Sequence, residues 1–168
     1  THQQTYDAIL ATPLTVDDIV AGEMLWCATK SLLNTLPILV VAFLLGAIQN
    51  WSALGAIPVF FLVGLCFAGP ALVMAALAAS YDFFNYYTTL LVTPMFIFSG
   101  VFYPVATLPA VAQVVVNILP LSHAIALIRP LVAGQPLVDP ALHVTVLVVY
   151  ATLGYVAASV FIRRRLIR

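Results

Sequence analysis

The chain has 168 residues, of which 64% are hydrophobic and only 7% are charged, and its mean hydropathy is +1.13. Soluble domains are about 45 to 50% apolar and about 25% charged, so this composition excludes a water-soluble globular protein and predicts an all-α integral membrane protein. The formal net charge is zero, which excludes the basic surface that binds nucleic acid.

The first 23 residues are expected to lie in the cytoplasm, ahead of the first membrane helix. The chain begins with Thr1 and has no basic segment ahead of an apolar one, which predicts the absence of a signal peptide and a trimmed or partial chain. Tyr6, Ile9 and Leu10 recur at helical spacing and predict a short amphipathic helix along the membrane surface. Pro13 ends this helix, because the residue before a proline disfavours helical backbone.

A second helix is expected to begin after Thr15 and to run through Glu23 into the membrane. Thr15 can cap its N-terminus, and Asp17 and Asp18 complement the positive end of the helix dipole. The residues alone leave two interpretations of the aspartates open. They cap a membrane helix, or they form an acidic elbow that docks a soluble partner.

Four apolar windows have about the 20 residues that a helix needs to cross a bilayer. They are residues 24–46, 54–79, 85–103 and 141–162. Prolines interrupt all but the last window, and the backbone hydrogen bonds they remove require help from neighbouring helices; these are Pro37, Pro58, Pro70 and Pro94. The second window also carries small residues that favour close helix packing: Gly64, Ala68, Ala71, Ala75 and Ala79.

The third window is the most aromatic part of the chain. Interfacial anchoring explains its aromatic residues as well as stacking on sugars or contact with acyl chains does. They are Phe83, Phe84, Tyr86, Tyr87, Phe96, Phe98, Phe102 and Tyr103.

Residues 104–140 are apolar enough for a fifth span, but prolines divide them into pieces of about 10 residues, each about 15 Å long. We therefore expect a re-entrant hairpin of two short helices in the outer leaflet, with a fifth span as the alternative. Ser122 is the expected N-cap of the second helix and Gly134 its stop. Irregular backbone at this depth must lie against protein or water.

The last six residues, 163–168, carry four of the six Lys and Arg residues. The positive-inside rule places them in the cytoplasm, and four crossings then place the N-terminus there too. Cys27 and Cys66 lie in apolar runs, where unpaired thiols are expected; two cysteines are too few for a disulfide framework or a zinc site.

Few residues suggest chemistry. The chain lacks a Gly-rich phosphate loop and any paired acid and base within the spans, which disfavours an ATPase or an intramembrane enzyme. His123 is about 20 residues from His143 and is interpreted as an isolated residue of the hairpin, with substrate contact as the alternative. Lys30 is expected to snorkel to the headgroups, with Glu23 two turns away, although an intramembrane charge is also a functional hypothesis.

Arg129 is expected at the outer interface. There it anchors the hairpin, pairs with Asp139, or meets an anionic head group.

Two long stretches resemble a known family. Residues 5–33, TYDAILATPLTVDDIVAGEMLWCATKSLL, and residues 98–134, FSGVFYPVATLPAVAQVVVNILPLSHAIALIRPLVAG, look like the corresponding segments of type-2 ABC exporter permeases. The resemblance is strongest to the branch of nodulation protein J and daunorubicin-type drug exporters. Members have six membrane helices, a cytoplasmic coupling helix between the second and third, and a re-entrant hairpin after the fifth.

By that resemblance the chain holds the third to sixth helices, and its site residues are carried over by position. ATPase coupling is expected at Tyr6, Asp7, Ile9, Leu10, Pro13, Leu14, Asp17, Asp18 and Glu23. The hairpin and a possible substrate path are expected at Asn117, Pro120, His123 and Arg129.

The resemblance also implies the partners. A separate cytoplasmic ATPase subunit would bind ATP and Mg, while this chain would bind no cofactor. A second permease copy, membrane lipids and a bacterial plasma membrane complete the expectation. The implied cargo is amphipathic, such as a lipo-oligosaccharide or a hydrophobic drug, and a non-transporting scaffold is the alternative function.

Overall fold

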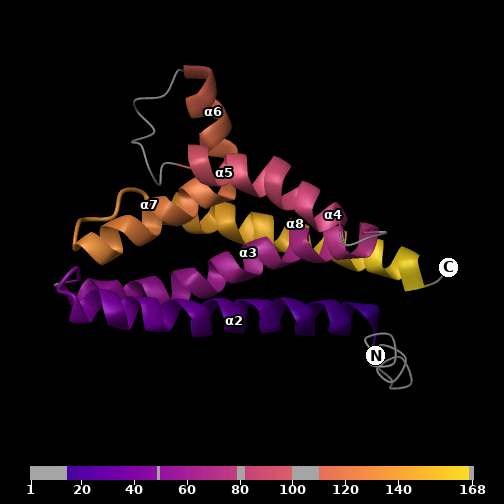
Figure 1. Cartoon of the computed structure of the whole chain (residues 1–168), viewed down its shortest axis with the longest axis horizontal. Helices are drawn as coiled ribbons and strands as arrows, with labels where there is room; N and C mark the ends of the chain where they lie inside the picture. The colour runs from indigo at the N-terminus through magenta and orange to yellow at the C-terminus, as the bar shows by residue number, and fades with distance from the viewer. Residues whose placement is uncertain (1–14, 49, 79–81, 100–109, 167–168) are drawn as a thin grey trace.

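A computed structural model describes residues 15–48, 50–78, 82–99 and 110–166, and every regular element in these ranges is helical (Figure 1). The all-α prediction is therefore confirmed for the described residues. Three helices are long and apolar enough to cross a membrane: Val16–Leu44, Trp51–Leu77 and Pro140–Arg165. They correspond to the first, second and fourth predicted windows.

Helix α2 (Val16–Leu44) begins immediately after Thr15, as the capping pattern predicts, and joins the elbow and the first span in one helix of 29 residues. At 1.5 Å per residue it is about 43 Å long, whereas the hydrocarbon core is about 30 Å thick. Its first turns can therefore lie outside the hydrocarbon. The helix continues through Pro37, so this proline does not interrupt the span.

The second span starts with a 3₁₀ turn, η1 (Trp51–Gly55), and continues as α3 (Ala56–Leu77). Pro58 lies in the first turn of α3. The backbone N–H groups there have no acceptor within the helix, so a proline, which has no N–H, removes no helical hydrogen bond. Pro70 lies within α3 and does not end it. Pro37 and Pro70 thus lie inside spans, as predicted, but neither ends its helix, whereas Pro58 removes no helical hydrogen bond.

The third predicted window is helical from residue 82 to residue 98, in three consecutive pieces. These are α4 (Asp82–Tyr87), the π-helical segment η2 (Thr88–Val92) and α5 (Thr93–Phe98). The π-helical segment η2 ends two residues before Pro94. Proline has no backbone N–H, so one helical hydrogen bond is missing at this position. The described part is about 25 Å long and its continuation falls outside the described residues, so a fourth crossing stays a prediction.

The predicted hairpin contains α6 (Ala110–Ile118) and α7 (Pro120–Ala133), and the last span is α8 (Pro140–Leu166). Gly134 ends α7 at φ 68°, as predicted. Ser122 is not the N-cap, because α7 already begins at Pro120, whose fixed φ suits a first helical position. The Ser122 hydroxyl instead donates to the Leu119 carbonyl at 2.7 Å and to the Val116 carbonyl. The depth of this region in a membrane stays a prediction.

Helix α3 packs against both α2 and α8, and the three run side by side in Figure 1. A Cβ atom on Gly64 would lie 2.7 Å from Ala28 Cα, and a Cβ atom on Gly69 would lie 2.4 Å from Gly154 Cα. The backbones therefore touch at both interfaces, in the manner of small-residue packing between membrane helices.

The predicted small-residue stripe is only partly correct. Gly64 makes a close contact and Ala68 is buried, whereas Ala71 and Ala75 are exposed and Ala79 lies outside the described residues. The closest backbone contact between α3 and its neighbouring helices belongs to Gly69, which the stripe did not include.

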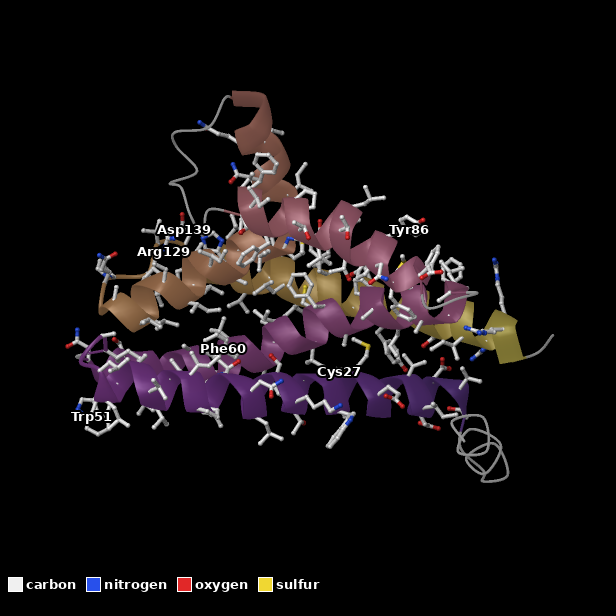
Figure 2. All side chains as sticks on the ribbon, in the orientation of Figure 1. Cys27, Trp51, Phe60, Tyr86, Arg129 and Asp139 are labelled. Atoms are coloured by element: carbon white, nitrogen blue, oxygen red, sulfur yellow. The ribbon has the colours of Figure 1, made fainter. Side chains whose placement is uncertain are left out.

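Much of the apolar surface of α2 has no neighbour among the described residues. Cys27 points from α2 toward α3, while large apolar side chains extend from the opposite side of α2 (Figure 2). The exposed ones include Leu25, Leu33, Ile38, Val41, Phe43 and Leu44. Such a surface suits contact with lipid or with another apolar helix.

Candidate functional site

The start of α2 and the end of α8 meet at one end of the bundle (Figure 1). Arg163 Nη2 donates to Asp17 Oδ2 at 2.9 Å, and the Tyr155 hydroxyl donates to the Asp17 carbonyl at 3.4 Å. Arg165 reaches the end of α3, where it donates to the carbonyl oxygens of Ala75 at 2.6 Å and Ala76 at 3.1 Å. The ends of three helices are thus joined through two arginines of the basic tail.

The Asp17–Arg163 ion pair contributes little to stability, but it shows where the two residues lie relative to each other. The side chains of Arg163 and Asp17 are 55% and 42% exposed, and such exposed pairs contribute at most about 1 kcal/mol. Their contact nevertheless requires residues 17 and 163 to lie on the same side of the bundle. An even number of crossings between them satisfies this requirement.

Thr15 and Asp18 form the predicted N-terminal cap. The Thr15 backbone N–H donates to Asp18 Oδ2 at 2.9 Å, the Thr15 hydroxyl donates to the same oxygen at 2.6 Å, and the Asp18 N–H donates to the Thr15 hydroxyl at 3.3 Å. The bonds that Asp18 accepts hold the pKa of its exposed carboxyl below the ordinary value. The Thr15 hydroxyl has the larger effect and the Thr15 backbone N–H the smaller one. The capping interpretation is confirmed, and the docking interpretation stays a prediction.

The other predicted coupling residues are only partly covered. Glu23 is half-buried on α2, beyond the capped first turn. Lys30 is exposed and its Nζ lies 5.4 Å from the centroid of the Trp26 ring, a cation–π contact that the sequence analysis missed. The remaining predicted coupling residues lie outside the described residues: Tyr6, Asp7, Ile9, Leu10, Pro13 and Leu14.

The structure joins two histidines that the sequence analysis separated. His123 Nδ1 lies 2.7 Å from His143 Nδ1, and His123 Nε2 lies 2.8 Å from the Asn117 carbonyl oxygen. The carbonyl can only accept, so His123 Nε2 carries a proton; in a neutral ring its Nδ1 then accepts the proton of His143 Nδ1. The interpretation of His123 as isolated is wrong, because α7 and α8 fold back against each other.

These contacts fasten the α6–α7 corner (residues 116–120) to α8. The Tyr150 hydroxyl adds a third bond by donating to the Ile118 carbonyl at 2.8 Å. Asn117 and Pro120 belong to this corner, whereas Arg129 lies further along α7, exposed on the side of the molecule away from α2 (Figure 2). The expected role of Arg129 stays a prediction.

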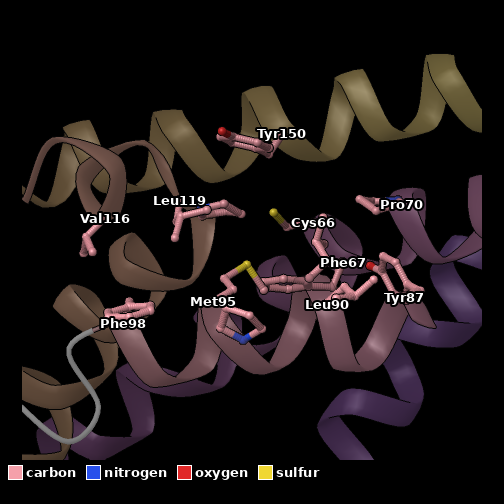
Figure 3. A pocket seen from close by; sticks show the side chains of 13 residues that line it. Cys66, Phe67, Pro70, Tyr87, Leu90, Met95, Phe98, Val116, Leu119 and Tyr150 are labelled. Carbon is pink, nitrogen blue, oxygen red and sulfur yellow. The ribbon is translucent and has the colours of Figure 1, made fainter. Parts of the chain in front are cut away.

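An apolar cavity of about 550 Å³ lies between this corner, α3, the helical run of residues 82–98 and α8 (Figure 3). Its volume falls within the roughly 300 to 1,000 Å³ of small-molecule sites. Among the described lining residues, hydroxyl groups come only from Tyr87 and Tyr150, and the other side chains are aliphatic, aromatic or sulfur-bearing. The lining residues are Cys66, Phe67, Pro70, Tyr87, Leu90, Leu91, Pro94, Met95, Phe98, Val116, Leu119, Pro120 and Tyr150.

Only one wall of this cavity could be predicted from the sequence. The aromatic third window contributes Tyr87 and Phe98, but the opposite wall comes from α3, the α6–α7 corner and α8. Cys27 and Cys66 are both free thiols, as predicted. Within the described ranges no three His, Cys, Asp or Glu side chains are grouped so that they could hold a metal ion.

Comparison with known proteins matches residues 1–133 to the family described as ABC-2 type transporter. The chain is 47% identical over 166 residues to Nodulation protein J of Rhizobium leguminosarum bv. trifolii, and 46% identical over 164 residues to that of Rhizobium meliloti (strain 1021). Nodulation protein J of Bradyrhizobium diazoefficiens is 42% identical over 166 residues.

These alignments cover 98 to 99% of this chain but 63% of each relative, so the chain spans less than two thirds of the relatives' length. No solved structure matches the chain at a significant level.

Proposed function

This chain belongs to the ABC-2 type transporter family, and we propose that it is the C-terminal part of the permease subunit of an ATP-driven exporter. The family and the relatives indicate a component of a membrane transporter. In the proposed assembly a separate cytoplasmic ATPase binds ATP and Mg, and this chain binds neither.

The observation that carries the proposal is the meeting of the α2 start and the α8 end through Asp17 and Arg163. We assign this end to the cytoplasm, because the basic tail follows the positive-inside rule. A soluble ATPase could then press on the segment before α2 and move α2 and α8 together. Rigid-body motion of packed helices is an established way to convert such a push into a change at a distant site.

The proposed cargo is amphipathic, such as a lipo-oligosaccharide or a hydrophobic drug. The apolar cavity supports this part of the proposal, since the described part of its lining offers little besides two tyrosine hydroxyls for polar recognition. A second copy of the permease would enclose the translocation path, and a bacterial plasma membrane would supply the surrounding lipid. Both ends of the chain would face the cytoplasm.

The decisive test measures ATPase activity of the permease reconstituted in vesicles with its candidate partner ATPase. Charge reversal at Asp17 and Asp18, or proline at Ile9, should lower transport-coupled ATPase activity while the permease still inserts. The control is Asp139→Asn, which removes a carboxylate before the start of α8 at a position whose positive φ asparagine tolerates, and it should leave ATPase docking intact. Unchanged activity in the Asp17 and Asp18 variants would refute the docking role.

A charge swap separates docking from local structure. In the double variant Asp17→Arg with Arg163→Asp, the ion pair between residues 17 and 163 can form again. Residue 17, however, would present a positive charge to the ATPase in place of a negative one. Activity should stay low if Asp17 docks the ATPase and should recover if Asp17 only fastens α2 to α8. An ATPase that co-purifies with the chain without any transport would instead favour a scaffold.

A further inference from the structure

A second hollow, of about 390 Å³, lies at the same end of the bundle, between the start of α2 and the end of α8. Its polar lining consists of Asp17, Tyr155, Ser159, Arg163 and Arg164. Two valines of α8 complete it, which gives the hollow one charged part and one apolar part.

The charges of the lining are not balanced. Arg163 and Arg164 contribute two positive charges, whereas Asp17 contributes one negative charge and already pairs with Arg163. Arg165 is engaged with the α3 carbonyl oxygens. Arg164, by contrast, has no hydrogen bond or ion pair within the part of the chain that the structure describes. Counted over the described residues that line it, the hollow therefore has a surplus positive charge available to an anion.

Ser159 provides a second, independent indication of a ligand. The residue is 8% exposed, and its buried hydroxyl has no hydrogen-bond partner among the described residues. A helical Ser or Thr commonly donates to the carbonyl four residues earlier, as Thr145 and Thr152 of the same helix do at 2.7 and 2.8 Å. Burying a hydroxyl without a partner is unfavourable, and a rotamer change can turn this hydroxyl toward an acceptor in the hollow.

The apolar part of the lining distinguishes a lipid from a free ion. Val156 and Val160 are 53% and 43% exposed and lie on the membrane-spanning part of α8, toward its basic end. A phospholipid at this position would place its chains along the valines and its phosphate at the arginines, at the boundary of the hydrocarbon. Guanidinium groups bind phosphate with paired, charge-assisted hydrogen bonds.

We propose that this hollow binds the phosphate group of an anionic phospholipid, with Arg164 as its main cation and Ser159 as a hydrogen-bond donor. Arg163 would share its guanidinium between the lipid and Asp17. The bound lipid would thereby fix the start of α2 at the membrane surface.

Native mass spectrometry of the purified chain in mild detergent tests this site, with phosphatidylglycerol as the probe and phosphatidylcholine of the same acyl chains as the comparison. Arg164→Gln should weaken phosphatidylglycerol binding by roughly tenfold, because it removes charge-assisted hydrogen bonds. The matched control Arg165→Gln removes the same charge from a neighbouring position and should change binding by less than about twofold.

Ser159→Ala separates a binding role from a structural one. It should weaken phosphatidylglycerol binding by roughly threefold, whereas the melting temperature should stay the same or rise because an unsatisfied hydroxyl is gone. Equal losses in Arg164→Gln and Arg165→Gln would overturn the proposal by showing only bulk attraction to the basic tail. So would equal binding of the two lipids, or displacement of phosphatidylglycerol by inorganic phosphate at the same concentration.

Discussion

Alanine in place of Gly69 is expected to push α3 away from α8. The added Cβ would lie 2.4 Å from Gly154 Cα, 2.6 Å from its carbonyl carbon and 3.0 Å from its carbonyl oxygen. Nonbonded carbon atoms prefer about 3.5 to 4.0 Å, so the two helices must separate by about 1 Å. All three atoms belong to backbone, and no side-chain rotation can relieve the contact.

The expected cost follows from two opposing effects. Overpacking of this kind costs about 1 to 3 kcal/mol, and backbone contacts belong to the upper part of that range. Alanine also gains up to about 1 kcal/mol over glycine in a helix interior. We therefore expect Gly69→Ala to lower the free energy of unfolding by about 1 to 2 kcal/mol.

Unfolding in mixed detergent micelles, followed by circular dichroism, measures this difference. Gly22→Ala in α2 is the matched control, because a Cβ there has nothing within 4 Å and only the helix propensity changes. It should raise stability by about 0.5 to 1 kcal/mol. Backbone contact at Gly69 does not limit the packing of α3 on α8 if Gly69→Ala is as stable as the unchanged chain, or if both alanine variants lose stability equally.

Three further predictions concern single side chains. His143→Leu should speed amide exchange at the α6–α7 corner about fivefold, as expected for one lost hydrogen bond, with the α2–α3 interface unchanged. Thr15→Ala should raise the pKa of Asp18 measured by NMR. Because the folded-state pKa lies below the unfolded one, the cap stabilises the folded chain at neutral pH. This stabilisation is lost as the pH falls through the folded pKa, and Thr15→Ala should make the loss smaller. Cys27 should react with a membrane-permeant maleimide before Cys66, which is 1% exposed; equal rates would contradict this burial.

The features that could be predicted from sequence are those set by local chemistry. Thr15 and Asp18 lie three residues apart and cap the same helix, so their pattern defines the start of α2 directly. Gly134 ends α7 because only a residue tolerant of positive φ suits that position. Hydropathy found the long spans for a similar reason, because each window alone exceeds the bilayer thickness.

The features that could not be predicted depend on which helices meet. His123 and His143 are joined by the fold-back of α7 on α8, which the spacing along the chain does not encode. Gly69 and Gly154 touch only because α3 crosses α8 at that level. Ser122 is not the N-cap of α7, because the helix already begins at Pro120. Both residues are common at helix starts, and the sequence alone does not show which of them begins this helix.

Helix α8 connects the proposed coupling end with the cavity. Arg163 binds Asp17 near its end, Gly154 touches α3 in its middle, and Tyr150 and His143 hold the α6–α7 corner nearer its start. The 27 residues form one uninterrupted helix without an internal proline, which makes bending between these contacts unfavourable. If an ATPase displaces the start of α2, the route to the cavity wall therefore runs through α8 as a rigid rod. Weakening the His123–His143 contact should then lower transport per ATP hydrolysed while leaving ATPase binding intact. Breaking the Asp17–Arg163 pair should instead lower both ATP hydrolysis and transport.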